Sequence, residues 1–135
     1  MEWMQQNIGM VLAALILLWM LWRRVLAPKL SGVKSLSSSE YLRLRDVDHL
    51  LIDVRSSGEW SSGHAERAKH IPLGDLNHRM KEIAKDKPVV VICASGMRSS
   101  QAATMLAKAG YGEVYNFSGG MGAWQGAGFS VVKGR

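Results

Sequence analysis

Residues 88–108, with the sequence PVVVICASGMRSSQAATMLAK, join an apolar run, a short polar stretch and a second apolar segment. The β-branched residues in succession at 89–92 are typical of a strand buried on both faces, as in a parallel sheet. Good helix formers with an apolar stripe follow at 101–108. A strand, a loop and a helix in this order predict one unit of an α/β domain.

The loop between this strand and this helix holds Cys93, the only cysteine in the chain. Ser99 or Ser100 is expected to cap the helix, and Gly96 allows the loop conformations that a β-carbon disfavours. Backbone N–H groups at a helix N-terminus point inward, and the helix dipole adds partial positive charge. A cysteine in that position ionises more readily, and the thiolate is the nucleophile. The loop therefore predicts a nucleophilic cysteine, and the alternative is a buried core thiol.

The cysteine count and the charge exclude several classes of protein. A single cysteine forms neither an internal disulfide nor a CxxC pair, so any group that it accepts must leave to another molecule or to a second copy of the chain. The histidines and the cysteine lack metal-ligand spacing, and we expect no metal and no cofactor. The formal net charge is +6, but the basic residues are dispersed and form no aromatic-interleaved patch. We therefore expect no nucleic-acid partner.

The N-terminal segment is strongly apolar. Residues 8–22 are uncharged, and with their apolar neighbours they reach the roughly 20 residues that a bilayer requires. Trp3 lies near one end, where an amphipathic ring favours the membrane interface. A cleaved signal peptide carries positive charge before its apolar run, where this chain has Glu2. The segment predicts one transmembrane anchor at residues 1–26, in contact with the membrane through residues 3–26.

Positive charge after the apolar run predicts an orientation. The basic residues there are Arg23, Arg24, Lys29 and Lys34. The positive-inside rule places them in the cytoplasm, so we expect a single-pass protein of the inner (cytoplasmic) membrane with its soluble domain in the cytoplasm. Pro28 marks a linker at 27–32, and residues 33–135 form the predicted domain.

The predicted domain alternates strands and helices, which indicates an α/β fold with a mostly parallel sheet of about five strands. The expected strands are 33–36, 50–54, 70–72, 88–92 and 113–116, and the expected helices are 38–45, 76–84, 101–108 and 121–125. In such sheets nucleophiles and ligands lie beyond the carboxyl ends of the strands, where Cys93 falls.

Short motifs along the domain carry a resemblance. They are LIDVR at 51–55, EW at 59–60, GHA at 63–65, AKHIP at 68–72, CASGMRS at 93–99 and GGMGAW at 119–124. In this order and spacing they resemble the single-domain rhodanese family over about residues 33–132. The departures are Ala65, where isoleucine is usual, and residues 68–70, where Gly-Ala-x-Asn is typical. The resemblance implies a rhodanese-like three-layer domain.

The resemblance also implies a sulfurtransferase of the thiosulfate:cyanide type. Cys93 would attack the outer sulfur of a small anionic donor such as thiosulfate and form a persulfide. A thiol, cyanide or a protein cysteine would then accept the sulfur. The implied substrate-binding loop comprises Ala94, Ser95, Gly96, Met97, Arg98 and Ser99. Backbone N–H groups and a guanidinium both suit an anion.

Several of these residues have a structural interpretation as well. Arg98 either binds the donor or is ion-paired away from the pocket, and a packing role is favoured for Met97. Asp53, Arg55 and Glu59 are interpreted as a structural ion-pair cluster, with a catalytic role for Arg55 as the alternative. His64 is expected to be a turn residue bonded to backbone, and acts as a base only if it reaches Cys93.

Two other functions remain open. Phosphatases and arsenate reductases of the same fold resemble this chain, but the phosphatase loop has five residues between cysteine and arginine. Residues 94–97 supply four, and the shorter loop suits one sulfur atom better than a tetrahedral phosphate. The second alternative is a membrane-tethered binding or regulatory module, or a sulfur relay with little turnover of its own. Inactive rhodanese domains usually lack the cysteine, so Cys93 favours the enzyme.

Overall fold

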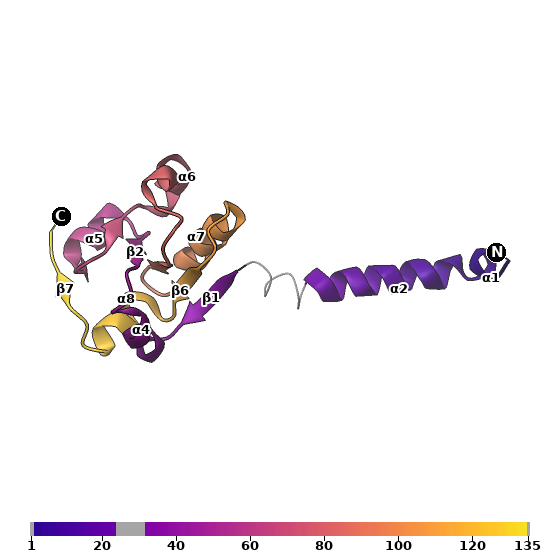
Figure 1. Ribbon diagram of the computed structural model, residues 1–135, viewed down its shortest axis with the longest axis horizontal. Coiled ribbons are helices and arrows are strands. Elements are labelled where there is room, and N and C mark those ends of the chain that lie inside the picture. Colours follow the sequence, from indigo (N-terminus) through magenta and orange to yellow (C-terminus); the bar gives the residue numbers. More distant parts are fainter. Residues whose placement is uncertain (1, 24–31, 135) are drawn as a thin grey trace. The chain divides into compact units, whose positions relative to one another are not determined.

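The computed structural model describes residues 2–23 and 32–134 of the chain. The chain divides into two compact units, residues 1–31 and residues 32–135 (Figure 1). The predicted linker at 27–32 lies outside the described residues except for Gly32, as do Arg24 and Lys29. The boundaries predicted on either side of the linker therefore stay predictions.

The first unit contains two helices, α1 (Glu2–Gln6) and α2 (Ile8–Leu21). Asn7 separates them with a φ of −114°, and its side-chain amide donates to the carbonyl of Trp3 at 2.8 Å. The 14 residues of α2 span about 21 Å at 1.5 Å per residue, whereas the hydrocarbon core of a bilayer measures about 30 Å.

The length of α2 bears directly on the predicted anchor. Within residues 2–23 and 32–134, no helix is both long enough and apolar enough to cross a membrane. The prediction of a single-pass protein in the inner membrane, made from the hydropathy of residues 3–26, is therefore wrong. Hydropathy alone missed the interruption at Asn7, which shortens the continuous helix.

The second unit is built on a five-stranded sheet. Its strands are β1 (Val33–Leu36), β2 (Leu50–Asp53), β4 (Lys69–His70), β5 (Val89–Ile92) and β6 (Val114–Phe117). The strand order is β1-β6-β5-β2-β4, and every neighbouring pair is parallel. The predicted α/β class with a mostly parallel sheet is confirmed. A separate antiparallel pair joins β3 (His64–Ala65) to β7 (Val131–Val132).

The central strand β5 faces two hydrophobic clusters, because successive side chains of a strand point to opposite faces. Val89 and Val91 belong to the cluster under α6 (Leu76–Arg79) and α7 (Met97–Lys108). Val90 and Ile92 belong to the cluster under α4 (Ser38–Leu44) and α8 (Gly120–Gly126). Helices thus cover both faces of the sheet and make three layers.

The shorter helices depart from or add to the predicted ones. The helix expected at 76–84 is α-helical only in α6, with 3₁₀ turns η2 (Leu73–Asp75) and η3 (Met80–Glu82) on either side. Asp75 makes no side-chain cap there. Helix α5 (Ser57–Ser62) follows β2 and begins with a capping box in which Ser56 and Glu59 bond each other's backbone N–H.

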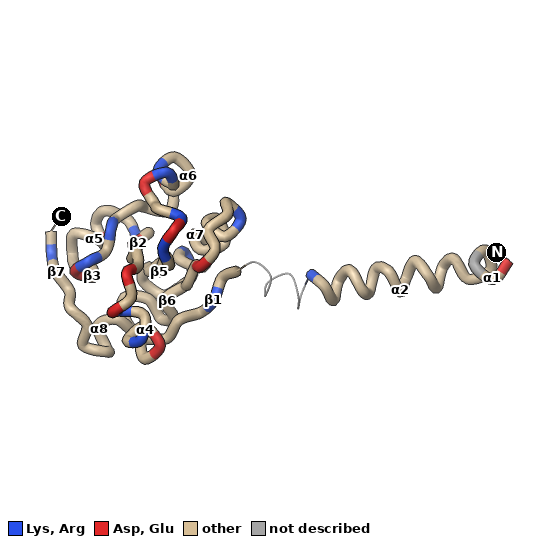
Figure 2. Tube along the Cα trace, in the orientation of Figure 1, with Lys and Arg blue, Asp and Glu red and all other residues tan. Residues whose placement is uncertain are grey.

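Basic and acidic residues are interspersed along the trace of the second unit (Figure 2). Ion pairs join several of them at the surface, including Lys87 with Asp48 at 3.1 Å and Arg79 with Glu82 at 2.8 Å. Pairs of this exposed kind contribute about 0–1 kcal/mol each. The charged surface therefore adds little to the stability that the two clusters supply.

Candidate active site

Cys93 follows β5 directly and lies at the carboxyl edge of the sheet. Strands β2 and β6 flank β5 and run parallel to it, so their ends meet at the same edge. The side chain of Cys93 is buried and belongs to the cluster on the α7 face. Burial by itself also fits a core thiol, so the polar groups around the sulfur are needed to distinguish the two interpretations.

Two polar groups of the loop contact the sulfur. The backbone N–H of Gly96 donates to Cys93 Sγ at 3.0 Å, and Ser99 Oγ lies 3.3 Å from it. Gly96 has a φ of +109°, a conformation that side chains with a β-carbon rarely adopt. It is also the N-cap of α7, so this helix begins at Met97 and not after Ser99 or Ser100 as predicted. The early start brings Ser99 into the first turn, beside the sulfur.

These contacts act on the ionisation of the thiol in opposite directions. Burial raises the pKa of Cys93 and is the largest single effect. Hydrogen bonds from the Ser99 side chain and from the backbone N–H groups of Ser99, Gly96 and Ser95 lower it. Together they outweigh burial, and the pKa of the thiol lies below its ordinary value. The loop therefore favours a thiolate that is buried and held by amides.

The remaining loop residues surround the sulfur from outside. Ala94 and Ser95 are exposed, and Met97 is 78% exposed, so Met97 does not pack into the core. Arg98 is directed to α5, where its Nη1 and Nη2 donate to Glu59 Oε1 and Oε2 at 2.7 and 2.9 Å. This bidentate ion pair holds the pKa of the Glu59 carboxyl at about 2 and raises the pKa of Arg98. The guanidinium predicted for the loop is therefore paired with a carboxylate.

The three acidic and basic residues predicted as one cluster form parts of two separate pairs. Arg55 binds Asp53 through Nε and Nη2 at 2.9–3.1 Å, and its Nη2 also donates to the carbonyl of Gly63 at 2.7 Å. Asp53 is fully buried and Arg55 is 6% exposed. Glu59 pairs with Arg98 instead. The buried pair joins the end of β2 to the start of β3, and the half-buried pair of Glu59 with Arg98 joins α5 to the loop.

The buried pair predicts a stability effect. Changing Asp53→Asn is expected to lower the free energy of unfolding by about 3 kcal/mol, because the guanidinium of Arg55 stays buried without its counter-charge. Urea unfolding measures the loss. The matched control is Asp48→Asn, which breaks the exposed pair with Lys87 and is expected to change stability by less than about 0.5 kcal/mol. Equal losses in the two variants would contradict the prediction.

His64 lies in the short strand β3 and not in a turn as predicted, and its imidazole bonds to backbone as expected. Its Nδ1 is 2.8 Å from the carbonyl oxygen of Trp60, and its ring stacks on the indole of Trp60 with centroids 3.4 Å apart. His70 stacks on the same indole at 4.7 Å and its Nε2 is 2.7 Å from the carbonyl oxygen of Arg55. The described hydrogen bonds of His64 do not include Cys93. His64 therefore joins the start of β3 to α5.

Two groups that sequence reasoning did not select support the loop. Asn116 on β6 accepts a hydrogen bond from Ser99 Oγ and donates through Nδ2 to the carbonyl of Gly96 at 3.2 Å. The backbone N–H of Met121, at the start of α8, donates to the carbonyl of Cys93 at 2.8 Å. The GG pair of the 119–124 motif, interpreted only as a turn, was a signal from which a close backbone approach could have been inferred. Nothing in the sequence pointed to Asn116, because β6 reaches the loop only through the strand order.

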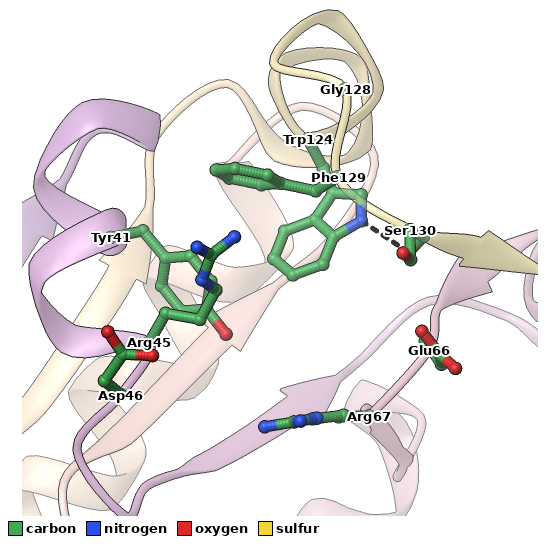
Figure 3. Close-up of a pocket in the computed structure, with 9 residues that line it drawn as sticks. All are labelled: Tyr41, Arg45, Asp46, Glu66, Arg67, Trp124, Gly128, Phe129 and Ser130. Atoms are coloured by element: carbon green, nitrogen blue, oxygen red, sulfur yellow. Dashed lines mark hydrogen bonds between the residues drawn. The ribbon is translucent and has the colours of Figure 1, made fainter.

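The second unit also has a surface hollow of about 320 Å³ (Figure 3). It is lined by Tyr41, Arg45, Asp46, Glu66, Arg67, Trp124, Gly128, Phe129 and Ser130. Its aromatic residues belong to the core on the α4 face, and its two guanidinium groups are matched by two carboxylates. The hollow therefore has no net charge with which to select an anion, and it contains no residue of the Cys93 loop. The polar contacts of Cys93 mark the site better than the size of a cavity does.

Comparison with known proteins identifies the family. Residues 37–127 match the family model of the rhodanese-like domain. The chain belongs to the rhodanese-like family. A sulfurtransferase of Allochromatium vinosum is 42% identical to this rhodanese-like chain over 97 residues, which cover 71% of the chain and 91% of the relative. The thiosulfate sulfurtransferase GlpE of Pseudoalteromonas translucida is 32% identical over 95 residues, or 70% and 90% of the two proteins.

A solved structure supports the same assignment of the rhodanese-like domain. The crystal structure of a rhodanese-related protein from Thermoplasma volcanium is 29% identical to the chain, with a TM-score of 0.67 over 73% of the chain and 97% of that protein. The rhodanese-like fold is therefore confirmed. The predicted enzyme class, a sulfurtransferase, is confirmed by the relatives.

Proposed function

We propose that this rhodanese-like domain moves a sulfane sulfur from a small anionic donor, such as thiosulfate, to a thiophilic acceptor through a persulfide on Cys93. The observation that carries the proposal is the backbone N–H of Gly96, which donates to the buried sulfur at 3.0 Å, together with Ser99 Oγ at 3.3 Å from it. Backbone N–H groups directed at a buried sulfur stabilise its anion, whereas a thiol that only packs in the core requires no such donors.

In the first half of the reaction the Cys93 thiolate attacks the outer sulfur of thiosulfate. A bond forms between Sγ and that sulfur, the S–S bond of thiosulfate breaks, and sulfite leaves with the electron pair. The product is a Cys93 persulfide with its negative charge on the outer sulfur. The lowered pKa of Cys93 supports this step, because the thiolate and not the thiol is the nucleophile.

In the second half an acceptor takes the outer sulfur. Cyanide, a thiolate or a protein cysteine attacks it, the bond to Sγ breaks, and the electron pair returns to Sγ as thiolate. With cyanide the product is thiocyanate. A single cysteine supplies no resolving thiol within the chain, so the acceptor must be another molecule or a second copy.

The loop supports sulfur chemistry over phosphate chemistry on two grounds. Four residues separate Cys93 from Arg98, one fewer than the phosphatase pattern requires. The guanidinium of Arg98 is also paired with both carboxylate oxygens of Glu59, so it is not presented to a tetrahedral oxyanion. The smaller cradle of amides suits one sulfur atom.

The intact mass of the protein after incubation with thiosulfate tests the proposal. We expect a gain of one sulfur atom that a thiol or cyanide reverses, and because the chain has one cysteine the modified position is unambiguous. Parallel assays follow thiocyanate formation and the hydrolysis of a phosphate ester. An unchanged mass, or phosphate-ester hydrolysis that depends on Cys93, would overturn the assignment.

The pair between Arg98 and Glu59 predicts an effect on both activity and pH dependence. Changing Glu59→Gln is expected to lower sulfur transfer about fivefold, because the pair tethers the loop to α5 and loss of positioning slows a reaction. The folded-state pKa of Glu59 is about 2, below its ordinary value. Its stabilising effect is therefore complete above an ordinary carboxyl pKa of about 4.3 and is lost as the pH falls toward 2. The melting temperatures of the variant and the parent should converge over that range.

Glu82 offers a matched control for this prediction. Its carboxyl pKa is also lowered to about 2, by hydrogen bonds from Arg79 and Lys69, but none of these residues belongs to the Cys93 loop. Glu82→Gln should show the same convergence of melting temperatures and leave sulfur transfer unchanged. A similar loss of transfer in both variants, or a gain in Glu59→Gln, would refute the tether.

A further inference from the structure

The hydroxyl of Ser99 lies between two acceptors. Ser99 is fully buried, and its Oγ contacts both Cys93 Sγ and Asn116 Oδ1. A serine hydroxyl has one proton and therefore donates to one of them at a time. The protonation state of Cys93 depends on which acceptor receives the hydrogen bond of that proton.

The carbonyl of Gly96 determines how the Asn116 amide is oriented. This carbonyl accepts from the N–H of Ser100 at 3.1 Å and from Asn116 Nδ2 at 3.2 Å. A carbonyl oxygen only accepts, so the amide nitrogen must face it and the amide oxygen must face Ser99. The Ser99 hydroxyl then donates to Asn116, and its oxygen is left to accept a proton from the thiol of Cys93.

We propose that Asn116 is a positioning residue. It accepts the hydrogen bond of the Ser99 hydroxyl, so that Cys93 does not receive it, and thereby slows the release of sulfur from the persulfide. The chain of donors runs from the Cys93 S–H to Ser99 Oγ and from the Ser99 O–H to Asn116 Oδ1. When Cys93 is a thiolate it can only accept a hydrogen bond, so the Ser99 hydroxyl must turn from Asn116 to the sulfur. Asn116 and the thiolate thus compete for one proton.

The competition affects one step of the sulfur transfer proposed above, the release of the outer sulfur to an acceptor. This effect on turnover rests on that proposed function. In the persulfide, Sγ carries neither a proton nor a charge, so the Ser99 proton stays on Asn116. When an acceptor attacks the outer sulfur, the S–S bond breaks and its electron pair makes Sγ a thiolate. A leaving thiol with a lower pKa leaves faster, so a group that disfavours this thiolate prolongs the persulfide.

Charged groups also face the loop from neighbouring elements. They are Arg98 on α7, Glu59 on α5 and the Asp53–Arg55 pair at the end of β2; Arg98 is coupled by charge to Cys93, Glu59 and Asp53. None of these groups bonds to Asn116 or Ser99 within the described contacts. Variants of Asn116 and Ser99 therefore leave these charges in place; Asn116→Ala removes the bond to the Gly96 carbonyl as well as the acceptor of the Ser99 hydroxyl.

A titration of the full-length chain labelled with [¹³Cβ]cysteine tests the inference, because the single cysteine gives one NMR signal. Asn116→Ala is expected to lower the pKa of Cys93 by about one unit, since the freed hydroxyl donates to the thiolate. Ser99→Ala is expected to raise it. In the double variant the pKa should equal that of Ser99→Ala alone, because the proposed effect of Asn116 on the thiol passes through the Ser99 hydroxyl. Discharge of a preformed persulfide to cyanide should be about threefold faster in Asn116→Ala.

The control is Tyr115→Phe on the same strand, whose hydroxyl bonds Glu113 and not the loop. It should leave the titration unchanged. If alanine at 116 prevents folding, Asn116→Leu keeps the volume and is measured in its place. An unchanged pKa in the Asn116 variant, or a shift that persists in the Ser99→Ala background, overturns the inference. Failure of the sulfurtransferase proposal is a different result, because the titration needs no sulfur donor.

Discussion

Cys93→Ser is expected to abolish sulfur transfer, with a loss of at least about a thousandfold in thiocyanate formation from thiosulfate and cyanide. A serine hydroxyl stays protonated at neutral pH and forms no bond to sulfur that an acceptor could reverse. The oxygen fits the space of the sulfur, which receives the N–H of Gly96 at 3.0 Å, so the fold should persist. Circular dichroism and a melting curve check the fold, and the intact mass should show no sulfur gain.

Ser100→Ala provides the control for this variant. Ser100 is exposed and lies one residue beyond the loop on α7. Its replacement should leave both the mass gain and the rate of thiocyanate formation at the parent level. The role of Cys93 would be refuted if Cys93→Ser kept more than a tenth of the parent rate while Ser100→Ala behaved normally.

Gly120→Ala is expected to have the largest effect on the structure around the loop. Gly120 has a φ of +57°, and a β-carbon there would overlap the carbonyl oxygens of Cys93 and Ala94. The start of α8 would have to retreat, which breaks the bond from the Met121 N–H to the carbonyl of Cys93. Backbone strain and overpacking together predict a loss of about 4 kcal/mol in the free energy of unfolding. Transfer by the folded fraction should fall at least about tenfold, because displacement of the loop misplaces its amides.

Gly122, two residues further along α8, is the matched control. A β-carbon at Gly122 meets nothing within 4 Å, and its φ is not positive. Gly122→Ala should therefore be neutral or stabilise the protein by up to about 1 kcal/mol, since alanine favours helix. Urea unfolding and thiocyanate formation are measured on both variants. Equal stability of Gly120→Ala and Gly122→Ala would show that α8 does not constrain the Cys93 loop.

Much of the fold was predictable because the signals are local. The β-branched run at 89–92 forms β5, and the serine at 37 with Glu40 forms the predicted capping box of α4. Alternation of strands and helices was enough for a parallel sheet, since parallel strands need crossover connections. The first residue of α7 was harder to predict from the sequence, because both Gly96 and the serines after it are acceptable N-caps.

The error over the anchor and the missed contacts of the loop have different physical causes. Hydropathy measured the composition of residues 3–26 and not the length of continuous α-helix, which is 14 residues in α2, between Asn7 and the end of the helix at Leu21. The pairing of Arg98 with Glu59 joins residues 39 positions apart, and that of Ser99 with Asn116 spans 17. Spacing along the chain says nothing about such contacts until the strand order is known.

The amino-acid sequence alone determined the α/β class, the place of the single thiol after a buried strand and the loop that follows it. These properties depend on the residues themselves and on their immediate neighbours, so they can be inferred without coordinates. Only the tertiary structure decided which groups face Cys93. Parallel pairing of β5 with β6 brings Asn116 to the loop, and the packing of α5 and α8 brings Glu59 and the Met121 N–H. Contacts between distant segments arise from how the elements pack together, and that arrangement sets the chemistry of the thiol.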